Sequence, residues 1–287
     1  MTALMAPSTA RLTPPTRVVI SDMQPGIYLD LADDAYRATN AVSCSVLKRF
    51  AEAPAKALVP SKDSAAMTAG RLIHSALLEP HKFDARYART TLDRRGTKDW
   101  KEEEAASGKA LLKVAEFDEL ATIRDAVMSH PTARELLAPG LEPEASVFWQ
   151  DDATGLLCRG RVDGLRRDQR LIVDLKTTVD ASPPEFAKSA GNYRHHWQEA
   201  FYRRGVKAAA GGFEADRFIF IALEREPPFL IGIYELSPSA VAQGEREVMR
   251  ALHEYAECER TGIWPGYAPE IVMVDLPMWA MEEEFVQ

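Results

Sequence analysis

The sequence predicts an α/β fold in which a central mixed β-sheet is flanked by helices. Three strand-like segments, 145–151, 155–165 and 170–178, follow one another with only the short turns "DATG" and "RRDQ" between them. This spacing is typical of an antiparallel three-strand meander. Further strands are expected at 216–224 and 229–236, and helical patterns come before, between and after the strands. Strand runs and helical runs in this order predict one sheet covered by helices.

The N-terminal residues read as a flexible arm, and the rest of the chain as one domain. Residues 1–25 are rich in Pro and Thr, and they lack the basic start and unbroken apolar stretch of a signal peptide. No internal boundary divides residues 26–287, so we expect a single domain there. The longest apolar runs, such as "FIFIAL", are far too short to cross a bilayer, which predicts no membrane partner.

Helical patterns account for most of the chain outside the strands. A Ser at position 43 or 45 is placed to cap the first of them. Residues 92–109 are polar, highly charged and punctuated by glycine, so a mobile loop or a frayed helix is expected. The tail 262–280 places aromatic residues between prolines. The expected helices cover 36–58, 64–80, 111–130, 195–210 and 238–260.

Composition excludes several classes of protein. Cys44, Cys158 and Cys258 are odd in number and scattered, which argues for a reducing cytoplasm and against disulfides, a zinc finger or a four-cysteine iron–sulfur cluster. A net charge of −8 argues against a surface coated in positive charge for nucleic acid. A local basic groove beside a metal ion remains compatible with that charge.

The strand "LIVDLKTT" carries two charges in an apolar context. Asp174 and Lys176 lie two residues apart and project from one face of the strand. Burying unpaired charges is costly, so such groups are paired or hold a metal. A salt bridge at the end of the strand is the simpler interpretation of this stretch alone.

The preceding strand brings a second acid to the same face. Arg159, Arg161 and Asp163 alternate along it, and neighbouring strands lie about 4.8 Å apart, so Asp163 and Asp174 can meet. Two carboxylates that close repel unless a proton or a divalent cation lies between them, and hard oxygen ligands favour magnesium or manganese. Lys176 would then lie beside the metal, where it can orient a water or stabilise charge on a phosphate. The arginines either bind phosphate or pair with acidic neighbours on the sheet.

These residues resemble the signature of the PD-(D/E)XK nuclease superfamily. "VDGL" followed by "IVDLKTT" places Asp163, Asp174 and Lys176 at its three marked positions. Residues 36–281 are similar to the RecE-type exonucleases (exodeoxyribonuclease VIII) of phages and prophages. "AGRLIHSALLEP" matches their Gly-x-x-x-His element through His74, and "WQEAFY" matches their Gln-x-x-x-Tyr element. The resemblance implies a restriction-endonuclease-like PD-(D/E)XK core.

The resemblance also implies a role for each matching residue. His74 and the Leu175 backbone carbonyl would join Asp163 and Asp174 as ligands of Mg²⁺, with Mn²⁺ as a substitute. Lys176 would act on the attacking water. Gln198 and Tyr202 would line the catalytic centre, and the residues that would contact DNA are Arg159, Arg161, Arg194 and His196.

The implied function is a magnesium-dependent exonuclease that degrades one strand of linear duplex DNA, 5′ to 3′, and leaves a 3′ single-stranded tail for recombination. Its implied partners are duplex DNA ends, a single-strand annealing protein and further copies of itself, in the cytoplasm of a bacterial host. Two rivals remain open: a structure-specific or restriction-like endonuclease on the same core, and an inactive DNA-binding scaffold. The presence of Asp163, Asp174 and Lys176 together argues against the scaffold.

Overall fold

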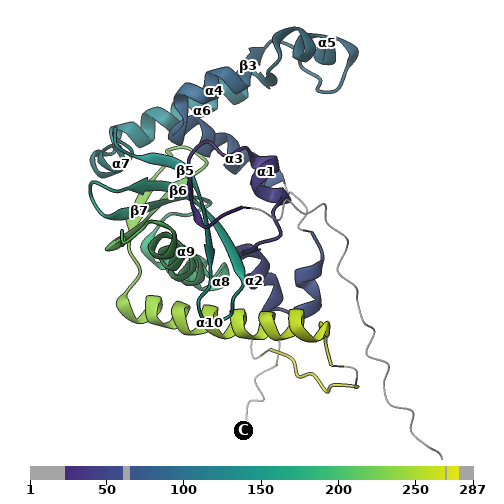
Figure 1. Ribbon diagram of the computed structural model, residues 1–287. Helices are drawn as coiled ribbons and strands as arrows, with labels where there is room; N and C mark the ends of the chain where they lie inside the picture. The colour runs from purple at the N-terminus through teal and green to yellow at the C-terminus, as the bar shows by residue number, and fades with distance from the viewer. Residues whose placement is uncertain (1–22, 61–64, 269, 278–287) are drawn as a thin grey trace, which may run out of the picture.

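A computed structural model describes residues 23–60, 65–268 and 270–277 of the chain. Most of the predicted N-terminal arm therefore lies outside the described residues. The described part is built on one large sheet with helices on both faces (Figure 1). The predicted fold class, an α/β fold with a mixed sheet flanked by helices, is confirmed.

The large sheet has seven strands within the described residues. The central three form the predicted antiparallel meander. The strand at 217–224 pairs in parallel with the third strand of the meander, and the strand at 231–234 pairs antiparallel with the strand at 217–224. The sheet is therefore mixed. The strands are β1 (Gly26–Tyr28), β2 (Val42–Ser43), β5 (Glu142–Gln150), β6 (Leu157–Arg166), β7 (Leu171–Thr178), β8 (Arg217–Glu224) and β9 (Ile231–Tyr234).

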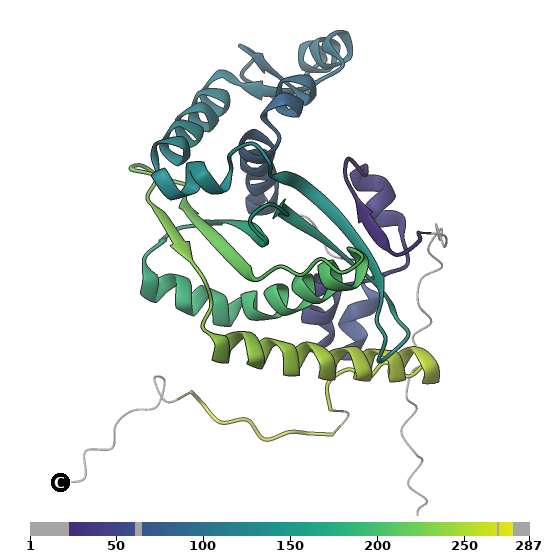
Figure 2. The same ribbon diagram turned by 60° about the vertical axis from the view of Figure 1, so that its left-hand side comes forward.

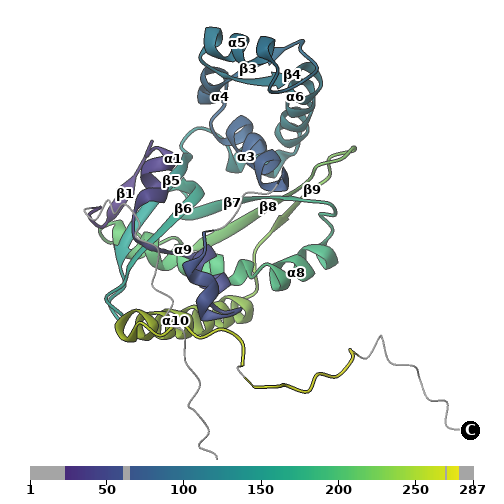
Figure 3. The same cartoon turned by 90° about the vertical axis from the view of Figure 1, so that its right-hand side faces the viewer.

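Two layers of helices cover the sheet, and Figure 3 shows one on each side of it. One layer consists of α2 (Cys44–Phe50), α8 (Pro183–Asn192), α9 (His195–Ala209) and α10 (Pro238–Thr261). The other consists of α3 (Ala65–Leu78), α4 (Pro80–Arg86), α6 (Val114–Ser129) and α7 (Pro131–Leu136).

Each layer has its own hydrophobic core, and β7 contributes to both because its side chains alternate between the two faces. Ile172 packs into the core under α9 and α10, whereas Val173 and Leu175 pack under α3 and α6. In the first core, a Cβ on Gly205 of α9 would come within 2.5 Å of the Trp149 ring, so the helix approaches the sheet through that glycine.

Residues 87–113 project from the body with α4 and α6 (Figure 1). The two short parallel strands β3 (Tyr87–Thr90) and β4 (Ala110–Lys113) flank α5 (Lys98–Ser107). Thr97 caps α5, and Gly108 ends it in the left-handed conformation. The segment expected to be a mobile loop or a frayed helix therefore contains an ordinary capped helix.

The N-terminal part differs from the prediction of one helix over 36–58. It divides into α1 (Asp33–Ala38), β2, α2 and the 3₁₀ helix η1 (Pro54–Leu58). Ser43, one of the two predicted capping residues, accepts a hydrogen bond from the Val46 N–H at the start of α2. The prediction also lacked α8 and β1.

Of the helices in the described part of the chain, not one combines the length and apolar character that crossing a lipid bilayer requires.

Candidate active site and metal centre

The candidate site lies where β6 and β7 separate. Their backbone pairing runs from Arg166 opposite Leu171 to Gly164 opposite Val173. At the next position the Asp163 carboxylate accepts a hydrogen bond of 2.7 Å from the Leu175 N–H. The N–H and C=O of one strand residue point to the same side, so the Leu175 carbonyl faces the same gap. The predicted carbonyl ligand thus lies beside Asp163.

Asp174 and Lys176 share one face of β7, as predicted, and form an ion pair there. Gln198 from α9 joins them: its Nε2 donates to Asp174 Oδ1 over 2.6 Å, and its Oε1 accepts from Lys176 Nζ over 3.0 Å. Asp174 is completely buried. Its burial raises the pKa of the carboxyl, Lys176 opposes this, and Asp163 adds to it. Burial lowers the pKa of Lys176, but the attraction of Asp174 and Asp163 outweighs this and raises it.

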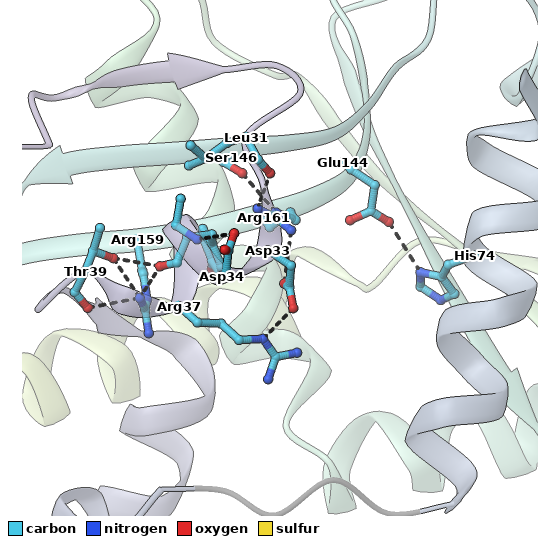
Figure 4. Close-up of polar contacts among 12 residues, drawn as sticks. Leu31, Asp33, Asp34, Arg37, Thr39, His74, Glu144, Ser146, Arg159 and Arg161 are labelled. Carbon is cyan, nitrogen blue, oxygen red and sulfur yellow. Dashed lines mark hydrogen bonds and ion pairs between the residues drawn. The ribbon is translucent and has the colours of Figure 1, made fainter. Parts of the chain in front are cut away.

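A cluster of possible metal ligands lies beside this pair. His74 Nδ1 on α3 is 3.6 Å from Asp163 Oδ2 and 3.9 Å from Glu144 Oε1 on β5, and Figure 4 shows His74 and Glu144 pointing toward each other. One ligand atom from each of the three residues lies within 4.8 Å of the others. The predicted ligands His74 and Asp163 are therefore together, and Asp174 lies near enough for Asp163 to raise its pKa.

Sequence reasoning missed Glu144. In the β5–β6 register it stands opposite Asp163, between the pairs Pro143–Gly164 and Ala145–Val162. Its φ of 49° is left-handed, which is uncommon for a residue other than glycine and occurs often at functional sites. Burial and the adjacent Asp163 charge raise the pKa of its carboxyl.

These residues fit a divalent cation. Glu144, Asp163 and Asp174 bring three carboxyl groups together, and burial, with a smaller contribution from the Asp163 charge, raises the pKa of Glu144 and of Asp174. Carboxylate and carbonyl oxygens with one imidazole nitrogen suit magnesium or manganese. A cation here would stabilise the ionised form of each carboxylate.

Tyr202 and Gly70 lie where α9 and α3 meet the sheet. Tyr202 lies one turn beyond Gln198 on α9, and its ring packs so closely on β6 that a Cβ at Gly160 would come within 2.9 Å of it. Burial raises the pKa of the Tyr202 phenol strongly. Gly70 of α3 faces β7, where a Cβ would lie at an ordinary contact distance of 3.6 Å from Thr177 Oγ1.

Arg159 and Arg161 face the N-terminal segment (Figure 4). Arg159 donates to the carbonyl and hydroxyl oxygens of Thr39, at 3.0 and 2.7 Å. Arg161 donates to Ser146 Oγ and to the Leu31 carbonyl, both at 2.9 Å, and pairs with Asp33. These contacts attach α1 to β6, so the predicted DNA contact of both arginines remains a prediction.

His196 and Arg194, the other two residues predicted to contact DNA, have different surroundings in the fold. His196 is 3.0 Å from Glu247 and 3.3 Å from the Ala190 carbonyl, so its ring joins α9 to α10 and α8. Arg194, at the N-terminus of α9, lies over the Trp197 ring and donates to the Lys48 carbonyl of α2.

Lys48 is a second residue that sequence reasoning missed. Its ammonium forms no ion pair or hydrogen bond with any residue in the described ranges. Burial and the nearby positive charges of Lys176 and Arg194 lower its pKa, whereas Cys44 and Asp174 oppose this. An amine at position 48 of a helix follows no pattern that distinguishes it from a solvated lysine, so the sequence alone gives no signal for it.

Fold and site together define a domain of the PD-(D/E)XK-like class. The chain belongs to the family described as "PDDEXK-like domain of unknown function (DUF3799)", whose sequence model matches residues 43–277. None of the curated proteins matches the sequence.

Several solved structures are similar to this chain, among them the following two. One, described as a "Putative exonuclease" from Eubacterium rectale, superposes with a TM-score of 0.58 at 12% identity, covering 87% of this chain and 97% of its own. The other is a phage-related exonuclease from Haemophilus somnus 129PT, with a TM-score of 0.36 at 14% identity, covering 77% and 95%. The first similarity establishes the shared fold.

Proposed function

We propose that this protein is a magnesium-dependent exodeoxyribonuclease that acts on the ends of linear duplex DNA. The observation that carries the proposal is the joining of Asp163, Asp174 and Lys176 at the gap between β6 and β7, with His74 and Glu144 alongside. Phosphodiester hydrolysis needs a charge-neutralising group, an activated water and a cation near the scissile phosphate, and these residues supply positions for all three.

The cation would be held by His74, Asp163, Asp174 and the Leu175 carbonyl, with Glu144 as an added oxygen ligand. A bound Mg²⁺ or Mn²⁺ supplies Lewis acidity toward the phosphate and lowers the pKa of a bound water. The residues of the chain supply the rest: Lys176 lies beside Asp174 and would direct its Nζ toward the attacking water or an anionic oxygen of the phosphate. Gln198 fixes the position of both Lys176 and Asp174 through its two hydrogen bonds.

Lys48 and Arg194 are the cations that we assign to DNA. Lys48 has no anionic partner within the described residues and lies near Lys176, so a phosphate beside the scissile one would supply the missing counter-charge. Arg194, at the N-terminus of α9, adds a guanidinium that contacts the Lys48 backbone carbonyl. DNA could bind Arg159, Arg161 and His196 only if these side chains gave up their present contacts within the protein.

The finer assignments depend on the RecE-type resemblance of residues 36–281. They are degradation of the 5′-ended strand, a 3′ single-stranded product, a homo-oligomer and a single-strand annealing protein as the partner that receives the product. The first similar structure supports the fold on which this activity would operate.

One experiment tests the proposal. Linear duplex DNA labelled at one 5′ or one 3′ end is incubated with the protein and Mg²⁺, beside a covalently closed circle and a sample in EDTA. We expect loss of the 5′ label first, an intact circle, and no reaction in EDTA. Asp174→Ala should abolish the reaction, and Asp118→Ala, a control on α6 in an ion pair whose two side chains are both exposed, should not. Equal cleavage of the circle would identify an endonuclease, and full activity in EDTA would refute metal dependence.

A further inference from the structure

Four aromatic side chains form a row of nearly parallel rings that runs from the edge strand β9 to the protein surface. The row consists of Tyr234, Phe186, His195 and Tyr193. Successive ring planes are tilted by 18°, 28° and 23°, and their centroids lie 4.4, 6.0 and 6.1 Å apart. The other ring pairs within the described residues meet at 31° or more. A row of stacked faces accepts a further flat ring only at an open end.

The open end of this row is Tyr193, which lies between α8 and α9 and is 68% exposed. The ring behind it is held in place, because His195 is buried and its Nε2 lies 3.3 Å from Ser189 Oγ. Helix α9, which begins at His195, lies between the sheet and α10 (Figure 2). At the inner end of the row, the Tyr234 hydroxyl donates to the Ala181 carbonyl. The exposed ring therefore has a fixed support, which lowers the entropy cost of stacking on a ligand.

This exposed ring lies beside the candidate active site. Arg194, the residue after Tyr193, donates to the Lys48 carbonyl of α2. The Gln198 N–H donates to the Arg194 carbonyl, so one turn of α9, about 5.4 Å, separates Arg194 from the residue that holds Lys176. Phosphates of one DNA strand follow each other about every 3.4 Å along the helix axis. A base stacked on Tyr193 would therefore belong to a nucleotide within a few steps of the scissile phosphate.

We infer that Tyr193 stacks on a nucleobase of the strand bound at the candidate active site, and that this base extends the row of rings. The inference rests on the proposed function, because it takes DNA as the substrate. Proteins hold single strands with aromatic rings beside a cationic groove, since every base offers a flat face whatever the sequence. Here Arg194 and Lys48 supply the cations, and Tyr193 supplies the ring. A base inside a duplex has both faces covered by its neighbours, so the base on Tyr193 is one that has left the stack.

Affinity for DNA with a short single-stranded 5′ or 3′ end, measured by fluorescence anisotropy, tests this stacking. Ca²⁺ replaces Mg²⁺, because it takes the same oxygen ligands and is expected not to support cleavage. Tyr193→Ala should weaken binding by about 5- to 150-fold, whereas Tyr193→Trp, which keeps a flat ring, should bind as the native chain does. Tyr267→Ala is the matched control: it removes another exposed tyrosine, in the segment after α10, and should leave the affinity unchanged.

A nucleotide that lacks its base separates stacking from any structural effect of the substitution. Moved along the single-stranded end, it should weaken binding of the native chain at one position by a factor similar to that of Tyr193→Ala. At that position it should cost the Tyr193→Ala protein nothing more, because the same contact is already gone. Native affinity in Tyr193→Ala, or a loss from the missing base that is equal in both proteins at every position, would overturn the inference and leave the proposed function standing. A native chain that binds no DNA would overturn both.

Discussion

Replacing Lys176 by alanine separates the structural part of the Asp174–Lys176 pair from its catalytic part. Asp174 is fully buried and would keep Gln198 as its remaining hydrogen-bond donor. Removing one partner of a buried ion pair costs about 3–5 kcal/mol when the other partner stays charged. Asp174 can escape part of this cost by binding a proton.

The loss of stability should therefore depend on pH. Burial already raises the pKa of Asp174 in the folded protein, and Lys176 opposes that rise, so its removal raises the pKa further. A carboxyl whose folded pKa exceeds its unfolded value of about 3.9 destabilises the fold increasingly as pH rises from the unfolded toward the folded pKa. We expect almost no change in unfolding free energy at pH 4, and a loss approaching about 3–5 kcal/mol at pH 8.

Urea unfolding of Lys176→Ala at both pH values, with and without Mg²⁺, measures this. Added Mg²⁺ should shrink the loss at pH 8, because a bound cation compensates Asp174. Turnover on linear duplex should fall by about 10²–10³-fold under the same conditions. Lys188→Ala is the control: it breaks an exposed pair with Glu185, which is worth at most about 1 kcal/mol. A loss of stability that is equal at pH 4 and pH 8, or turnover near the native rate, would refute this reasoning.

Three other substitutions test separate features. Glu144→Gln should weaken Mg²⁺ binding by at least about tenfold in calorimetric titrations, and unchanged affinity would remove Glu144 from the ligand set. Burial raises the pKa of Glu199 to about 7, so the free energy of unfolding falls as pH rises from about 4.5 to 7. Glu199→Gln should therefore raise the free energy of unfolding by up to about 3 kcal/mol at pH 8 and by almost nothing at pH 4, as measured in urea titrations. Gly205→Ala should cost at least about 1–3 kcal/mol in thermal melts, because its Cβ meets Trp149, whereas Gly191→Ala in open space should be neutral or stabilising.

The strands at the centre of the site were predictable because their residues alternate or form apolar runs between clear turns. The period of two placed Asp174 and Lys176 on one face, and the meander placed Asp163 on the neighbouring strand. The short strands β1 and β2 escaped prediction because two or three residues carry no period. Helix α8 escaped it because its sequence, "PPEFAKSAGN", mixes prolines, glycine and asparagine with few apolar residues.

Residues whose role depends on register or partner were not predictable. Glu144 becomes a possible ligand only through its position opposite Asp163, which requires the exact pairing of β5 with β6. Arg161 carries the charge that suits DNA, yet the structure pairs it with Asp33 and the Leu31 carbonyl. The residue type sets which interactions a side chain can make, whereas the fold determines which residues it contacts.

The two helical layers contribute different residues to the candidate site, so local unfolding of one layer would separate these residues. His74 belongs to α3, whose Ile73 and Leu77 pack in one core, while Gln198 belongs to α9 over the other. Brief detachment of the α3 layer would carry His74 away while the sheet kept Asp163 and Asp174 in place. Heating would therefore separate His74 from the other site residues before the whole domain unfolds. A cation bound by residues of both layers would stabilise the folded protein against the local and the global unfolding.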